Sequence, residues 1–89
     1  MVNVWSRTKQ SYPSHVVVCK SGEHYESFGG DAVLFSNLAG TPMNTLHEGT
    51  SNSIAATRFR QELAEVNIGC LTAVGRRVIV VDNNVTIHV

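Results

Sequence analysis

The sequence predicts a single small α/β domain with a mixed β-sheet and two helices. Its 89 residues are 43% hydrophobic and 16% charged, which is typical of a globular chain and excludes a disordered one. This length suits one domain around one core. Short apolar runs rich in β-branched residues alternate with segments of helical spacing, and this alternation predicts the α/β class.

Residues 1–14 are predicted to be a polar N-terminal arm, and residues 15–89 to be the α/β domain. The arm shows no regular pattern and ends at Pro13-Ser14. Because Pro13 disfavours the continuation of a helix or of a central strand, we expect the arm to lie outside the sheet.

The first strand and the first helix are predicted in the next part of the chain. The apolar run at residues 16–19 favours a strand buried on both faces. Gly22 supplies a turn or bulge, and extended pairing resumes near Tyr25. Asp31 is the predicted N-cap of a helix that ends at Gly40. One apolar face of this helix is made by Ala32, Leu34, Phe35 and Leu38.

The strongest helical pattern lies in the second half of the chain. Residues 41–53 are polar and predict a mobile loop with a weak strand at residues 43–47. A second helix is predicted to begin at Ser51, Asn52 or Ser53 and to end at Gly69. Its apolar face is lined by Ala55, Phe59, Leu63 and Val66.

Three strands are predicted to close the chain, at residues 70–74, 78–81 and 85–89. A hairpin turn at residues 82–84 joins the last two strands, because Asp and Asn tolerate positive φ.

Charge and cysteine content narrow the function classes. The formal net charge is zero, so bulk electrostatics indicate neither a nucleic-acid nor a membrane partner. No apolar stretch reaches the roughly 18 residues of a membrane helix. Cys19 and Cys70 each lie in an apolar run and are predicted to be reduced core residues. We therefore expect a cytoplasmic protein.

No motif of an enzyme or of a metal site is present. The four histidines include no His-x-x-x-His pair, and there is no Cys-x-x-Cys pair. An acid/base cluster of Glu23, His24 and Glu26 is an open alternative, but on an extended strand residues 24 and 26 point one way and residue 23 the other. We expect no catalytic residues, no cofactor and no metal.

One segment carries a specific resemblance. Residues 22–28 read Gly-Glu-His-Tyr-Glu-Ser-Phe and are followed by Gly30-Asp31-Ala32 and a helix. This segment resembles the start of the mismatch-recognition domain (domain I) of the DNA-repair protein MutS, which has a Gly-Asp-Phe-Tyr-Glu-x-Phe motif after an apolar strand. A Pro-Met element at residues 42–43 and a helix, glycine and apolar run at residues 63–74 are similar to that family in the same order.

The resemblance implies a base-probing role for two residues of this chain. In that family the phenylalanine stacks on a mispaired base, and the glutamate two residues later hydrogen-bonds the same base. His24 stands in the stacking position and Glu26 in the hydrogen-bonding position. Histidine can stack on a base but offers less area than phenylalanine, so the probing motif is altered.

The basic side chains are the candidate phosphate contacts. The first twenty residues carry three bases and no acid, and a further arginine pair lies near the last strands. Because the chain is neutral and affinity follows the number of phosphates neutralised, we expect weak DNA binding that needs an oligomer or a partner protein. The predicted phosphate contacts are Arg7, Lys9, Lys20, Arg76 and Arg77.

Two hypotheses follow from these observations. The first is a non-enzymatic DNA-binding module with an altered base-probing motif. The second is a small structural or protein-interaction module that keeps the same scaffold without reading DNA, assembling through an exposed strand edge. The match at Glu26 favours the first, and the zero net charge favours the second.

Overall fold

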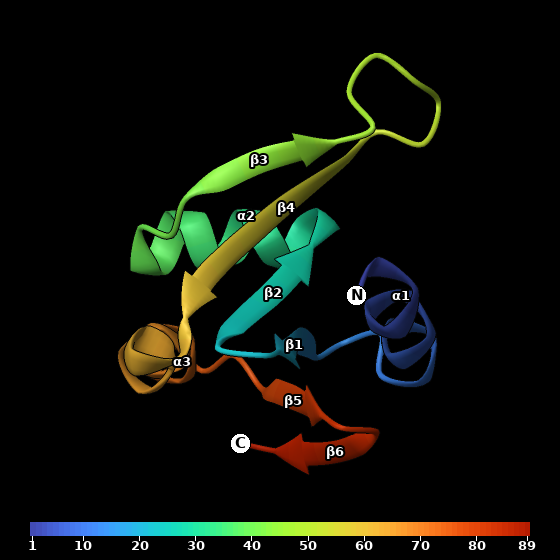
Figure 1. Cartoon of the computed structure of the whole chain (residues 1–89). Helices are drawn as coiled ribbons and strands as arrows, with labels where there is room; N and C mark the ends of the chain where they lie inside the picture. The colour runs from blue at the N-terminus through green and yellow to red at the C-terminus, as the bar shows by residue number, and fades with distance from the viewer.

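The computed structural model describes residues 1–89 as a six-stranded mixed sheet with helix α1 on one face and helices α2 and α3 on the other (Figure 1). The strand order is β3-β4-β2-β1-β5-β6; β1 and β5 are parallel, and every other neighbouring pair is antiparallel. The predicted α/β class with a mixed sheet is confirmed. In chain order the elements are α1 (Val2–Ser11), β1 (Val16–Ser21), β2 (His24–Phe28), α2 (Gly29–Ala39), β3 (Met43–Leu46), β4 (Ile54–Arg60), the 3₁₀ turn η1 (Gln61–Leu63), α3 (Ala64–Thr72), β5 (Val78–Asp82) and β6 (Val85–His88).

The larger part of the core lies between the sheet and helices α2 and α3. Side chains of a strand alternate between its two faces, so every second residue of β1 and β5 points to these helices. Phe35 of α2 and Leu71 of α3 are fully buried against them. This core comprises Val16, Val18, Phe35, Phe59, Ala64, Ile68, Leu71, Val78 and Val80.

The smaller part of the core lies on the opposite face, under α1. Val17 and Cys19 of β1 are fully buried there beside Ile79 and Val81 of β5. Three residues from α1 and the turn after it cover them: Val4, Trp5 and Tyr12. The prediction that residues 16–19 form a strand buried on both faces is therefore confirmed.

The predicted turn at Gly22 and the predicted hairpin turn at residues 82–84 are also confirmed. Gly22 has φ +61° in the tight turn between β1 and β2. Asn83 and Asn84 have φ +53° and +67° between β5 and β6, the pair of left-handed residues that a two-residue hairpin turn requires.

The N-terminal segment differs from the prediction. Residues 2–11 form helix α1 instead of an irregular arm, and α1 packs on β1 and β2. Val4, Trp5, Thr8 and Lys9 recur at helical spacing and are half-buried. Pro13 lies just beyond the helix, where proline is tolerated because the helix has already ended.

The predicted second helix is wrong over its first half. Residues 54–60 form strand β4, which pairs with both β2 and β3. Ala55 and Phe59 fit a helical face, but Thr57 and Phe59 also alternate with Arg58 and Arg60 at the strand period. The hydrogen bonds to two neighbouring strands decide in favour of the strand.

The strand predicted at residues 70–74 is wrong as well. Helix α3 runs through Gly69 to Thr72, and Ala64, Ile68 and Leu71 give it a buried face at helical spacing. The sheet therefore has three helices around it, one more than predicted.

The predicted cap of α2 is a further correction. The helix begins at Gly29 after an extended Phe28, and Asp31 lies inside its first turn without a side-chain capping bond. The Asp31 carboxylate is 4% exposed and bonds to groups outside the helix. The predicted end at Gly40 is confirmed, because Gly40 has the left-handed φ of +73°.

The weak strand expected near residues 43–47 is confirmed as β3, which forms a hairpin with β4. The loop of residues 47–53 extends from the sheet (Figure 1). Its mobility stays a prediction. Both cysteines are free thiols; Cys19 is fully buried and Cys70 half-buried against the core.

Candidate nucleic-acid interface

Strand β2 places His24 and Glu26 on one face of the sheet. Because side chains alternate along a strand, His24, Glu26 and Phe28 point to the side of α1, and Tyr25 points to α2 and α3. Trp5 of α1 contacts Phe28 with ring centroids 6.0 Å apart. Helix α1 thus covers the Phe28 end of β2 and leaves the His24 end only partly covered: His24 and Glu26 are both half-buried.

Two arginines that the sequence-based prediction missed stand opposite these residues. In the pairing of β2 with β4, Arg58 is the partner of Glu26 and Arg60 the partner of His24. Arg58 Nη2 lies 3.2 Å from His24 Nδ1, and Arg58 Nε lies 3.8 Å from Glu26 Oε2. The missed signal was the alternation in Thr-Arg-Phe-Arg, which places both arginines on one strand face.

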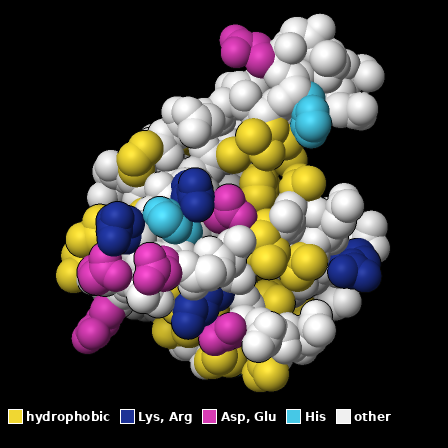
Figure 2. Space-filling view, in the orientation of Figure 1, with side chains coloured by type: hydrophobic (Ala, Val, Ile, Leu, Met, Phe, Trp, Pro, Cys, Tyr) yellow, Lys and Arg dark blue, Asp and Glu magenta, His cyan; other side chains and the backbone are white.

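Figure 2 shows basic, acidic and histidine side chains gathered on this side of the molecule, beside the part that α1 covers. Arg60 Nε lies 3.0 Å from Oε2 of Glu62 in η1, so this carboxylate offsets part of the positive charge of Arg60. The surface is mixed in sign, and it has no large block of one charge. A shallow groove of about 380 Å³ runs beside it, lined by His24, Pro42, Asn44, Arg58, Phe59, Arg60 and Leu63.

The opposite face of β2 holds this site rigidly against the core. Tyr25 stacks on Phe59 with centroids 5.9 Å apart and planes 9° apart, and Phe59 in turn contacts Phe35 of α2. Tyr25 is half-buried against this core, and Phe28 is buried on the other face of the strand beside Trp5, so neither aromatic ring is free to contact DNA. The backbone of His24 and Glu26 is therefore fixed by packing on its far side.

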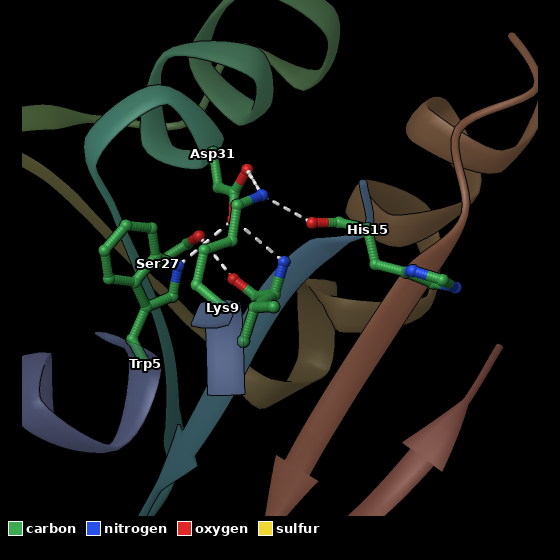
Figure 3. A network of polar contacts seen from close by, with 6 residues as sticks. Trp5, Lys9, His15, Ser27 and Asp31 are labelled. Atoms are coloured by element: carbon green, nitrogen blue, oxygen red, sulfur yellow. Dashed lines mark hydrogen bonds and ion pairs between the residues drawn. The ribbon is translucent and has the colours of Figure 1, made fainter. Parts of the chain in front are cut away.

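The ammonium of Lys9 has a structural role in the fold. Lys9 Nζ lies 2.8 Å from Asp31 Oδ1 and donates a hydrogen bond to the carbonyl of His15 (Figure 3). Oδ2 of Asp31 accepts bonds from the indole N–H of Trp5 at 3.1 Å and from the backbone N–H of Val17 at 3.0 Å. This network joins α1, β1 and α2, and it occupies the Lys9 ammonium.

Lys20, another predicted phosphate contact, lies next to His24 in the sheet but on its other face, because it pairs with Tyr25. Arg7 is exposed on α1, and Lys20 Nζ lies 4.0 Å from Asp82 Oδ2. Arg76 and Arg77 are exposed before β5, and the Arg77 carbonyl accepts from the N–H of Val16 at the start of β1.

Arg76 and Arg77 lie at one end of β1, and His24 and Glu26 lie beside the other. Ser21, at the end of β1, pairs with His24, whereas Val16, at its start, is bonded to Arg77. Five residues of strand separate these points by about 16 Å. The structure thus joins His24 and Glu26 to Arg58 and Arg60, and not to Arg76 and Arg77.

A cluster of three rings lies at that other end. Tyr12, His15 and His88 contact one another edge-on, with centroids 5.4 to 5.8 Å apart. Desolvation lowers the pKa of His15, and the nearby charges of Arg77, His88 and Lys9 lower it further. This cluster attaches β6 to the turn before β1.

The structure shows no group of three or more His, Cys, Asp or Glu side chains that could hold a metal ion. None of its helices has the length and apolar character needed to cross a membrane.

Comparison with known families decides what this scaffold is. The family model of MutS domain I matches residues 1–88, essentially the whole chain. The chain belongs to the MutS domain I family. No curated protein matches it.

The family membership gives the fold a functional context. In MutS, domain I is a DNA-binding domain that recognises mismatches, and it is not a catalytic domain. The match includes residues 2–11, so α1 falls within the MutS domain I region of the chain. The predicted resemblance to MutS domain I is confirmed.

Proposed function

We propose that this chain is a non-enzymatic DNA-binding module of the MutS domain I family with an altered base-probing motif. His24 supplies the ring that stacks on a base, and Glu26 supplies the hydrogen-bond acceptor. The observation that carries the proposal is that both side chains project from one strand to the same accessible face, beside two arginines. A stacking ring next to positive charge is the combination that nucleic-acid sites use.

Phosphate contacts in this proposal come first from Arg58 and Arg60. Their side chains are 58% and 65% exposed and flank the probing pair. Arg7, Arg76 and Arg77 are outlying contacts that a longer or bent duplex reaches. Lys20 is close to His24 along the sheet but lies on its other face. Lys9 is the weakest candidate, because a phosphate would have to compete with the buried carboxylate of Asp31.

We expect the binding to be weak. The formal net charge is zero, and each acid near the site offsets part of the attraction for phosphate. An oligomer or a partner protein that adds phosphate contacts is therefore part of the proposal.

The direct test is a titration at low salt with matched duplex, mismatched duplex and single-stranded DNA, followed by fluorescence anisotropy. We expect the mismatched duplex to bind tightest. Replacement Glu26→Ala is expected to lower the ratio of mismatched to matched affinity by roughly fivefold or more, because one base contact is worth about 1–3 kcal/mol of discrimination.

A matched control is Glu62→Ala. Glu62 is a carboxylate on the neighbouring segment that binds Arg60. Loss of the Glu62 carboxylate should leave the ratio of mismatched to matched affinity unchanged. Equal affinities for all three DNAs, or equal effects of the two variants, would reject base probing by Glu26.

A second candidate function is protein interaction through strand β6. This strand is an edge of the sheet, and Val85, Ile87 and Val89 of the C-terminal segment are 57%, 45% and 58% exposed. An edge with unpaired backbone groups and an apolar row is a template for pairing with another strand. Light scattering over a concentration series distinguishes this function: self-association without DNA binding would favour it over the first.

A further inference from the structure

Arg58 contacts both members of the proposed probing pair. Its Nη2 lies 3.2 Å from His24 Nδ1, and its Nε lies 3.8 Å from Glu26 Oε2. The strand register explains this position, because Arg58 stands directly across from Glu26 and diagonally across from His24. One guanidinium therefore bridges the two side chains.

The chemistry of the guanidinium fixes the state of the histidine ring. Arginine carries five N–H donors and no acceptor, and it does not lose its proton in proteins. In the Arg58–His24 contact the Nδ1 atom must therefore accept the hydrogen bond. A ring that accepts at Nδ1 is neutral and carries its proton on Nε2. The Nε2–H then lies on the opposite side of the ring from Arg58.

We propose that Arg58 is a positioning residue that holds His24 as the neutral Nε2–H tautomer beside Glu26, so that the pair presents one donor and one acceptor to DNA. The DNA part of this inference rests on the proposed function; the state of the ring does not. Because Nε2–H lies in the plane of the ring, its natural acceptor is the edge of a base next to the one on which the ring stacks, and a neutral ring adds no charge that would attract phosphate.

Stability does not explain the arrangement. Arg58 is 58% exposed, and a surface ion pair contributes little to the free energy of unfolding. Arg60 shows that the contact is specific: it lies two residues away on the same strand face but binds Glu62 at 3.0 Å. Arg60 is therefore a matched control for every change made at Arg58.

The first test reads the tautomer of His24 by ¹⁵N NMR on the free chain at about pH 8, where an ordinary imidazole is neutral. The His24 signals are assigned by their loss in His24→Phe. We expect an essentially pure Nε2–H form in the wild type. A substantial Nδ1–H population in the wild type would overturn the proposal.

Charge reversal makes the test sharper. In Arg58→Glu a carboxylate replaces the donor, so we expect His24 to shift to the Nδ1–H form. In Arg60→Glu the new carboxylate stands across from His24, but the Arg58 donor remains at Nδ1, so we expect the Nε2–H form to persist. The same tautomer in both variants would overturn the role of Arg58. Should Arg58→Glu fail to fold, Arg58→Met replaces it and is expected to give a mixture of tautomers.

The second test measures DNA preference in Arg58→Met and Arg60→Met, which each remove one positive charge. We expect both to lose overall affinity, and Arg58→Met alone to lose about fivefold in mismatched-to-matched preference, the value of one hydrogen bond. Equal preference in the two variants would overturn the positioning role. Failure of the wild type to bind DNA would instead reject the proposed function, while the NMR result still decides the state of His24.

Discussion

The ammonium of Lys9 lies 2.8 Å from Oδ1 of Asp31, and this ion pair connects helix α1 to the first turn of α2. The carboxylate also accepts from Trp5 and from the backbone of Val17, so it satisfies three donors from two other elements. One side chain thus fixes the position of the N-terminal helix on the sheet.

Removal of the Asp31 carboxylate should therefore destabilise the whole domain. We expect Asp31→Ala to lower the free energy of unfolding by about 3 kcal/mol, because it leaves a partly buried ammonium without its counter-charge and two N–H groups without an acceptor. Urea unfolding followed by the fluorescence of Trp5 measures this. Glu65→Ala, which removes an exposed carboxylate from α3, is the control and should change stability by less than about 0.5 kcal/mol. Similar losses in the two variants would contradict the network.

The packing of Trp5 against the start of α2 should require a glycine at position 29. It has φ +57°, and a Cβ there would lie 3.1 Å from the Trp5 ring. We expect Gly29→Ala to cost about 1–2 kcal/mol through backbone strain and displacement of Trp5. The neighbouring Gly30→Ala is the control: its φ is not positive and nothing lies within 4 Å of the new carbon, so it should be neutral or slightly stabilising. Thermal unfolding of the two variants separates these outcomes.

The two thiols should differ strongly in reactivity. Burial raises the pKa of the Cys19 thiol from its usual value of 9.0 to about 11, which lowers its thiolate fraction roughly a hundredfold. Cys70 is only half-buried. In the native chain we expect a thiol reagent to label Cys70 first, and in urea to label both cysteines at similar rates. Mass spectrometry of the labelled peptides gives the order, and faster native labelling of Cys19 would contradict the buried strand.

The pH dependence of stability should reflect His15. Its pKa is lowered in the folded chain by desolvation and by the charges of Arg77, His88 and Lys9, so the unfolded chain binds the proton more readily. The neutral His15 ring therefore contributes fully to stability above about pH 6.5. This contribution is lost as the pH falls from about 6.5 through the lower pKa of His15 in the folded chain. We expect His15→Phe, which keeps a ring against Tyr12 and His88, to show a smaller loss between neutral and acidic pH than the wild type. Parallel curves of unfolding free energy against pH for the wild type and His15→Phe would contradict this role of His15.

Much of the sheet was predictable from local pattern, and the errors have a common cause. The run at residues 16–19, the Asn83-Asn84 turn and the strands β5 and β6 were predicted because each has one compatible structure. Strand β4 was missed because Ala55, Phe59 and the arginines fit both a helix and a strand. Pairing with β2 and β3, which local pattern does not contain, resolved the ambiguity.

The candidate site was predictable only in part for the same reason. The position of His24 and Glu26 on one face follows from the strand period alone. Arg58 and Arg60 enter the site through the register of β4 with β2, a long-range contact that no local motif encodes. The error in the secondary structure of residues 54–60 was thus also the error that concealed the arginines.

The salt dependence of DNA binding should locate the phosphate contacts. The logarithm of affinity against the logarithm of salt concentration has a slope of about −0.9 for each phosphate neutralised on duplex DNA. If the duplex lies on the face of His24 and Glu26, the double variant Arg58→Met, Arg60→Met should reduce the slope by about 1 to 2. The matched double variant Arg76→Met, Arg77→Met removes the same charge at the opposite end of β1, and with a duplex too short to reach that end it should leave the slope nearly unchanged. A larger reduction from the second variant would place the duplex at the Arg76–Arg77 end and separate the phosphate contacts from the probing pair.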